Sequence, residues 1–144
     1  MKILWNIVLV FLAFIAGSLI MMPIEGIGYV LYPLPEGVEP GANDAFRKHV
    51  AGLPLTAFAI VWLSHFFGPL VATFIAARFA AYRSLIPACV VGVLYLAAGI
   101  TNLILIGHTG AFAIVDLALY PIAFLLGVWL GKQKPAPAIA ANTL

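Results

Sequence analysis

The chain has 144 residues, of which 65% are hydrophobic and 8% are charged. Charged residues make up about 25% of a typical water-soluble domain, so this composition excludes that class. The formal net charge of +2 gives no reason to expect a nucleic acid as a partner. Long uncharged runs predict instead an all-α integral membrane protein, in which residues 1–131 form a single four-helix transmembrane bundle.

The first predicted span covers residues 3–22, and residues 23–52 are predicted to form one long loop after it. The loop begins at Pro23 and is rich in proline and glycine, for example in the stretch YPLPEGVEPG. Proline lacks a backbone N–H and glycine favours turns, so this composition predicts turns and extended chain rather than a regular helix. Glu25 is therefore predicted to lie at the end of the first span.

A short amphipathic helix is predicted near the end of this loop. Asn43 or Asp44 can cap its first turn, since both side chains accept hydrogen bonds from backbone N–H groups. Phe46 and Val50 share its apolar side, because residues at this spacing lie on one face of a helix. We expect this helix to lie on the membrane surface and to lead into the second span.

The second span, residues 53–80, has the most informative pattern in the chain. Small residues recur at every fourth position, which is typical of closely packed membrane helices. This stripe consists of Ser64, Gly68, Ala72, Ala76 and Ala80. His65 lies beside it, roughly 12 residues into the span and therefore ~18 Å deep at ~1.5 Å per residue. An ionisable side chain at that depth is costly, which makes His65 a candidate functional residue.

The third and fourth spans are predicted at residues 85–106 and 111–130, joined by a short loop. One face of the third span carries Gly92, Tyr95, Gly99 and Asn102, and one face of the fourth carries Asp116, Tyr120, Ala123, Gly127 and Gly131. Glycine on such a face predicts close packing between helices. Residues 132–144 are predicted to be a disordered tail.

The basic residues predict the orientation in the membrane. One side of the bundle is flanked by Lys2, Arg78, Arg83, Lys132 and Lys134, and the other by Arg47 and Lys48. By the positive-inside rule, both termini and the tail are predicted to be cytoplasmic. The long loop between the first two spans is then extracytoplasmic.

The four polar residues on the small-residue faces form the predicted binding site: Glu25, His65, Asn102 and Asp116. In this topology Glu25, Asn102 and Asp116 would lie in the outer leaflet, with His65 beneath them, around one outward-facing pocket. His65 and Asp116 are expected to be near neighbours or to share one water-filled cavity. Because their depths differ, a cavity, or a bridge by Asn102 or water, is favoured over a salt bridge. The alternative is structural: hydrogen bonds between helices, with Asp116 capping the fourth span.

Other kinds of site have less support. Ser64 directly precedes His65 and so points in a different direction, which disfavours a nucleophile–base pair. His, Asp and Glu can bind a divalent metal, but no close spacing such as His-x-x-x-His supports a metal here. A haem held by His65 would need a second histidine at similar depth, and His49 and His108 are both predicted near the surface. We therefore expect neither catalysis nor a cofactor.

The last three spans contain a series of short motifs: Leu53-Pro54, His65 with Gly68, Ala76-Ala77-Arg78, Gly99-Ile100 with Asn102, and Asp116 with Tyr120-Pro121. In these motifs the chain resembles a group of small four-helix bacterial membrane proteins. The loop at residues 107–110 departs from the pattern, because Gly-His-Thr-Gly stands where that group has Pro-His-Pro. The resemblance implies the fold and a location in the bacterial inner (plasma) membrane, and it implies no activity.

Two functions are compatible with these features. The leading hypothesis is a structural or accessory membrane subunit that forms a homo-oligomer or joins a larger membrane complex, because the small-residue stripe exceeds what one neighbouring helix needs. The alternative is a protein that binds or translocates a proton, an ion or a small solute through the polar pocket. In both cases the lipid bilayer surrounds the bundle.

Overall fold

The computed structural model describes residues 1–41, 43–107 and 110–132, and every regular element in this part of the chain is helical. The long helices are α1 (Lys2–Leu31), α3 (Leu55–Phe79), α4 (Ile86–Ile106) and α5 (Ala111–Gly131). A short helix, α2 (Asp44–Ala51), precedes α3, and one 3-10 turn, η1 (Ala81–Arg83), joins α3 to α4. The prediction of an all-α protein is confirmed.

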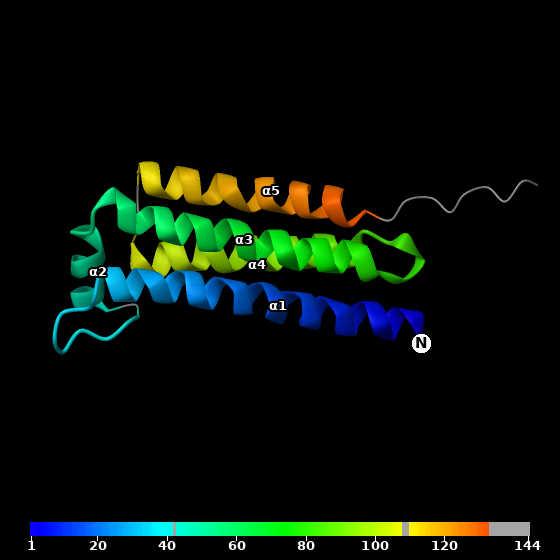
Figure 1. The fold of residues 1–144 in the computed structure, drawn as a ribbon, viewed down its shortest axis with the longest axis horizontal. Coiled ribbons are helices and arrows are strands. Elements are labelled where there is room, and N and C mark those ends of the chain that lie inside the picture. The colour runs from blue at the N-terminus through cyan, green and yellow to red at the C-terminus, as the bar shows by residue number, and fades with distance from the viewer. Residues whose placement is uncertain (42, 108–109, 133–144) are drawn as a thin grey trace, which may run out of the picture.

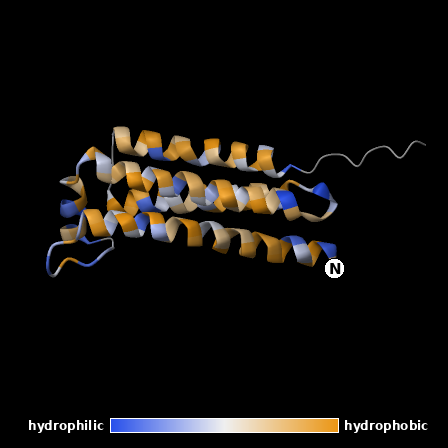
Figure 2. Ribbon diagram, in the orientation of Figure 1, coloured by the Kyte–Doolittle hydropathy of each residue, from blue (hydrophilic) through white to orange (hydrophobic). Residues whose placement is uncertain are grey.

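Each of the four long helices is long and apolar enough to cross a membrane, as predicted. Many of their large apolar side chains face outward: Phe11 is 65% exposed, Ile104 72% and Trp129 72%. A water-soluble bundle would cover most of this surface, whereas lipid tails are as apolar as these side chains. Figure 2 shows hydrophobic residues along the four helices and hydrophilic residues mainly at the two ends.

Three of the predicted spans agree with α3, α4 and α5 to within two residues at each end. The first does not, because α1 continues through Pro23 to Leu31 instead of ending at residue 22. Proline removes only its own N–H, and membrane helices tolerate this loss where the surrounding structure satisfies the freed groups. Residues 23–31 are therefore helix rather than loop, and Glu25 lies within α1.

Figure 1 shows that α3 lies between α1 and α5 and that successive long helices run in opposite directions. The helices α1 and α5 make the most extensive contacts with α3, and α4 packs against all three of the others. Short connections from α3 to α4 and from α4 to α5 favour antiparallel neighbours. The central helix α3 therefore positions the other elements.

Hydrogen bonds fasten α1 to α3 at both ends. At one end, Trp5 Nε1 donates to the Phe79 carbonyl at 2.9 Å. At the other, the hydroxyl oxygens of Tyr32 and Thr56 are 2.6 Å apart. These contacts hold the two helices in one register, and that register determines which residues of α1 face His65.

The short helix α2 covers one end of the bundle, which we call the α2 end. Asn43 caps this helix by accepting a hydrogen bond from the Phe46 N–H at 2.8 Å, and Phe46 and Val50 are buried as predicted. Arg47 Nε donates to the Leu105 carbonyl at 2.9 Å. That carbonyl belongs to the last turn of α4, where no helical N–H is available. This bond and the apolar side of α2 hold the helix over the bundle.

Small residues allow α3 to approach both of its main neighbours. A Cβ atom added to Gly17 of α1 would lie 2.5 Å from the Gly68 carbonyl oxygen and 2.8 Å from Ala72 Cβ, both in α3. On the other side, a Cβ added to Gly127 of α5 would lie 2.6 Å from the Leu70 carbonyl oxygen. The predicted stripe is buried at all five positions: Ser64, Gly68, Ala72, Ala76 and Ala80. Close backbone approach thus sets the spacing of three helices.

The contact between α4 and α5 places aromatic rings over glycines. A Cβ atom added to Gly92 would lie 2.7 Å from the Phe124 ring, and one added to Gly99 would lie 2.5 Å from the Tyr120 ring. Each glycine therefore accommodates a ring of α5. Because Tyr120 lies one helical turn after Asp116, this fit also fixes the level of Asp116 in the bundle.

We expect Gly17→Ala to destabilise the protein and Gly26→Ala, in the same helix, to be neutral or slightly stabilising. Alanine is favoured over glycine within a helix by about 1 kcal/mol. At residue 17 the added methyl group meets the backbone of α3, and overpacking of this kind costs about 1–3 kcal/mol. Nothing lies within 4 Å of a Cβ added at residue 26. Thermal unfolding in detergent compares the variants, and equal stability would contradict the close α1–α3 contact.

Candidate functional site

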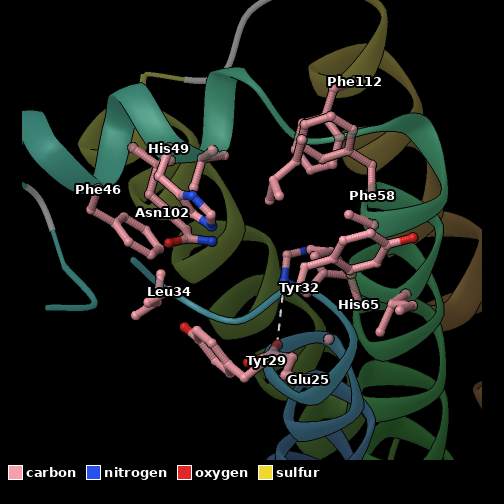
Figure 3. Close-up of a pocket in the computed structure, with 17 residues that line it drawn as sticks. Glu25, Tyr29, Tyr32, Leu34, Phe46, His49, Phe58, His65, Asn102 and Phe112 are labelled. Atoms are coloured by element: carbon pink, nitrogen blue, oxygen red, sulfur yellow. Dashed lines mark ion pairs between the residues drawn. The ribbon is translucent and has the colours of Figure 1, made fainter. Parts of the chain in front are cut away.

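A pocket of about 200 Å³ lies at the α2 end, and every α-helix contributes to its wall (Figure 3). Its polar lining comes from Glu25, Tyr29, Tyr32, His49, His65 and Asn102. Its apolar lining includes the rings of Phe46, Phe58 and Phe112. The pocket therefore combines aromatic walls with a small number of polar groups that converge from different helices.

His65 is the most deeply buried of these polar groups, and Asp116 holds it from behind. His65 Nδ1 and Asp116 Oδ1 are 2.6 Å apart, and the two side chains are 6% and 1% exposed. An ionised carboxylate can only accept a hydrogen bond, so Nδ1 carries the hydrogen when Asp116 is ionised. The ring of Tyr120 lies against the imidazole, with 5.4 Å between centroids. The imidazole is thus oriented, and its other nitrogen, Nε2, faces α1.

Glu25 approaches that second nitrogen from α1. Its Oε1 lies 3.8 Å from His65 Nε2, which is too long for a hydrogen bond but is within ion-pair range when the imidazole is protonated (Figure 3). Ser64 Oγ lies 3.0 Å from the same Oε1 and 2.8 Å from the Val61 carbonyl oxygen, and these two acceptors share its single hydrogen. The Glu25 side chain is 40% exposed, so its carboxylate borders the pocket.

Two buried polar atoms near His65 have no hydrogen-bond partner among the described residues: Asp116 Oδ2 and Trp62 Nε1. Trp62 stacks on Phe112, with 5.6 Å between centroids and 16° between ring planes. This pair lies one turn before His65 and Asp116 on the same two helices. A buried unpaired polar atom costs about 1–3 kcal/mol. The α3–α5 contact therefore carries polar groups that do not serve stability.

The structure gathers the four predicted site residues at one end of the bundle. Glu25, His65 and Asn102 line the pocket, whereas Asp116 contacts it only through His65. His65 and Asp116 are near neighbours, which was one of the two predicted arrangements, but the preference for a cavity over a direct contact is wrong. His65 is five residues further into its helix than Asp116, so contact requires α3 to begin ~8 Å further out than α5 at ~1.5 Å per residue. Predicted depths had assumed that both helices begin at one level.

Several pocket residues were missed from the sequence. Tyr29 follows Glu25 by four residues and so shares its face of α1, and Tyr32 is the residue that caps the end of this helix. That spacing was visible, but a helix predicted to end before Pro23 concealed its meaning. His49, expected near the surface, lines the pocket from α2. The predictions for His108 and for residues 133–144 concern positions outside the described residues.

The chemistry available at this site is proton exchange and ion or solute binding. Ser64 directs its hydroxyl to Glu25 and to the Val61 carbonyl, so it is not arranged as a nucleophile activated by His65. Within the part of the chain that the structure describes, no three His, Cys, Asp or Glu residues are grouped as metal ligands. What remains is an imidazole placed between two carboxylates beside a pocket.

Comparisons of the chain with protein-family models, with curated proteins and with solved structures found no match in any of the three. The resemblance to small bacterial four-helix proteins therefore stays a prediction. The function has to be inferred from the pocket and from the side chains at its inner end.

We expect His65→Ala and Asp116→Asn to be coupled in their effects on stability. Both substitutions act on the same contact, since His65→Ala removes the imidazole and Asp116→Asn removes the negative charge that holds it, so the second should cost less once the first is present. Polar pairs in membrane proteins give coupling energies of about 0.6 kcal/mol on average and ~1.7 kcal/mol at most. We expect the upper value, because this contact is short and buried. Unfolding of the four proteins of the cycle in detergent measures it.

Asp44→Asn is the matched control for this cycle. The Asp44 side chain is fully exposed on α2 and makes its ion pair with Arg47. Its effect should add to that of His65→Ala within about 0.5 kcal/mol. If Asp116→Asn were coupled to His65→Ala no more strongly than this control, an energetic contact between His65 and Asp116 would be refuted.

Proposed function

We propose that this protein binds a small polar solute in the pocket at the α2 end, where Glu25 and His65 contact the solute. One observation carries the proposal: Asp116 holds His65 from behind, while Glu25 and the far side of the imidazole border a pocket of about 200 Å³. Small-molecule sites are typically concave and mostly apolar, with a few polar groups that fix the orientation of the ligand. The lining of this pocket fits that description.

A purely structural role for these residues explains less. For adhesion between two membrane helices, no more than one hydrogen bond between facing side chains is needed. Here three ionisable side chains meet, and Asp116 Oδ2 has no partner within the described part of the chain. Ionisable groups inside a membrane are expensive and mark binding sites or pathways. Binding therefore accounts for the cluster better than adhesion does.

Binding also fits the molecule better than passage across the membrane. On the far side of His65 from the pocket, the core consists largely of closely packed alanine side chains, with one valine, two tyrosines and the buried Thr73, whose hydroxyl donates to the Pro69 carbonyl of its own helix. This core includes Ala13, Ala72, Ala76, Ala77, Ala88, Val91, Tyr95 and Tyr120. A pathway for an ion or solute would need a polar lining through this half of the bundle.

Self-association was predicted on the ground that the small-residue stripe exceeds what one neighbouring helix needs, and the structure removes this reason. The stripe on α3 is occupied inside the chain, where Gly68 and Ala72 lie against Gly17 of α1. On its other side, α3 packs against α5. The stripe therefore offers no free face to a second copy, and we do not base a function on it.

We place the protein in the bacterial inner membrane, with the α2 end outside the cytoplasm. Lys2, Arg78, Arg83 and Lys132 are close in sequence to the helix ends opposite α2. Arg47 and Lys48 lie on α2 itself. The larger number of basic residues opposite the pocket supports this orientation under the positive-inside rule. The pocket would then be reached from the extracytoplasmic side.

Aqueous access to the pocket tests the proposed binding function. In a Cys89→Ala background, we expect Asn102→Cys to react with neutral hydroxyethyl methanethiosulfonate at least ten-fold faster than Ile104→Cys. Asn102 lines the pocket, whereas Ile104 is 72% exposed on the outer surface and is nearer the end of α4. If lipid filled the space beside Asn102, which is an exposed residue of α4, residue 102 would be no more reactive than residue 104. Equal rates measured in lipid nanodiscs would contradict a solute pocket.

A labelling experiment tests the orientation separately. In the same background, we expect Glu36→Cys to react with a membrane-impermeant maleimide in spheroplasts, and Tyr82→Cys to react only after permeabilisation. Glu36 lies in the loop before α2, and Tyr82 is 73% exposed in η1 at the opposite end. The reverse pattern would move the pocket to the cytoplasmic side and leave its binding function unaffected.

A further inference from the structure

We infer that the solute bound in this pocket carries an ammonium group, an inference that rests on the proposed binding function. Three features of the lining carry it: the balance of charge, the aromatic side chains that line the pocket with Glu25, and the size of the pocket. The first two distinguish a cation from an anion and from a neutral solute, and the third shows that an organic amine fits.

The charge balance at the pocket is negative. Among the described residues that line it, Glu25 is the one acid, and neither lysine nor arginine is present. Asp116 adds a second carboxylate behind His65. When both carboxylates are ionised, a protonated His65 matches one of the two negative charges and leaves the other to His49 or to a ligand. In a medium of low dielectric constant, an unmatched charge strongly favours a ligand of opposite sign.

The arginine and lysine of α2 lie outside the pocket lining. Arg47 donates to the Leu105 carbonyl and pairs with Asp44, and it is not part of the pocket lining. His49 is the only titratable residue that α2 contributes to the lining among the described residues. Within the described part of the chain, Glu25 has one hydrogen-bond donor, Ser64, and one more distant imidazole nitrogen, that of His65. A donor supplied by a ligand would complete the coordination of this carboxylate.

Aromatic rings line the same pocket as this carboxylate. Tyr29 follows Glu25 on α1 and Tyr32 caps that helix, while Phe58 of α3 and Phe112 of α5 also line the pocket, with 4.9 Å between their centroids. The face of an aromatic ring attracts a cation and repels an anion. An anionic solute would meet both Glu25 and these rings, and a neutral one would leave Glu25 unmatched. An ammonium group is attracted both by the carboxylate of Glu25 and by the faces of the aromatic rings.

The pocket is large enough for an organic amine. Its volume is about 200 Å³, whereas one water molecule occupies a share of ~30 Å³ in the liquid. An ammonium group could come from a free amine in solution or from the headgroup of phosphatidylethanolamine. The pocket lies at the α2 end of the bundle, where either source could reach it.

Isothermal titration of the full chain in maltoside micelles tests the ammonium group directly. The probes are butylammonium chloride, sodium butyrate and butanamide, which share a chain length and differ in charge. We expect butylammonium to bind at least ten-fold more tightly than the other two. Glu25→Gln should weaken that binding at least ten-fold, whereas Glu36→Gln, in the exposed loop, should leave it unchanged. Tyr29→Leu, at a half-exposed ring, should weaken it at least three-fold and provides a second test if Glu25→Gln does not fold.

The outcomes separate this inference from the proposed function. Tighter binding of butyrate or butanamide than of butylammonium would overturn the ammonium assignment and leave a solute pocket in place. Butylammonium binding that is unaffected by both Glu25→Gln and Tyr29→Leu would also overturn it. Absence of binding by all three probes would overturn it as well, and the reactivity of Asn102→Cys then decides separately whether the pocket function survives.

Native mass spectrometry identifies the source of the ammonium group. The delipidated protein is offered equal amounts of phosphatidylethanolamine and phosphatidylglycerol. Preferential retention of phosphatidylethanolamine by the wild type, lost in Glu25→Gln, would assign the headgroup. Equal retention together with butylammonium binding would assign a free amine. Preferential retention of phosphatidylglycerol by the wild type would overturn the inference.

Discussion

The buried contact between His65 and Asp116 is the constraint on which the α2 end depends. It joins α3 to α5 through side chains that are almost completely excluded from solvent, 2.6 Å apart. Because Asp116 holds Nδ1, the other ring nitrogen, Nε2, points toward α1, where Glu25 borders the pocket. Breaking a buried polar pair by removing one partner leaves the other uncompensated, so the two residues are useful only together. The position of α5 relative to α3 therefore decides whether a site exists at all.

Much of the fold follows from the sequence, because membrane helices are specified mainly by length and hydropathy. The ends of α3, α4 and α5 and the capped amphipathic helix α2 were predictable for that reason. The exception is α1, where Pro23 was taken as a helix end. Proline ends a helix in water more reliably than in a membrane, where neighbouring helices compensate for the lost N–H. The same error concealed the relation of Tyr29 and Tyr32 to Glu25.

The site was less predictable than the fold because it depends on how far each helix is shifted along its neighbours. Glu25, His65, Asn102 and Asp116 could be selected from the sequence as costly polar residues on packing faces. Their contacts could not, since a shift of a few residues between α3 and α5 separates a direct hydrogen bond from a bridged pair. That shift is set by close fits such as Tyr120 against Gly99, which periodicity alone does not reveal. The wall supplied by α2 likewise depends on the tertiary bond from Arg47 to α4.

The two halves of the bundle differ in what holds them together, and this difference makes a costly site tolerable. Away from the pocket, α1, α3 and α5 approach closely through Gly17, Ala72 and Gly127, and Trp5 ties α1 to the end of α3. Dense packing of this kind supplies stability without polar groups. Near the pocket, an acceptor of Asp116 stays unpaired within the described residues and the carboxylate of Glu25 borders open space. Polar groups that lack hydrogen-bond partners persist where the surrounding structure holds them in place, and they are then available to bind a ligand. The close packing of one half therefore compensates for the destabilising polar groups in the half that contains the pocket.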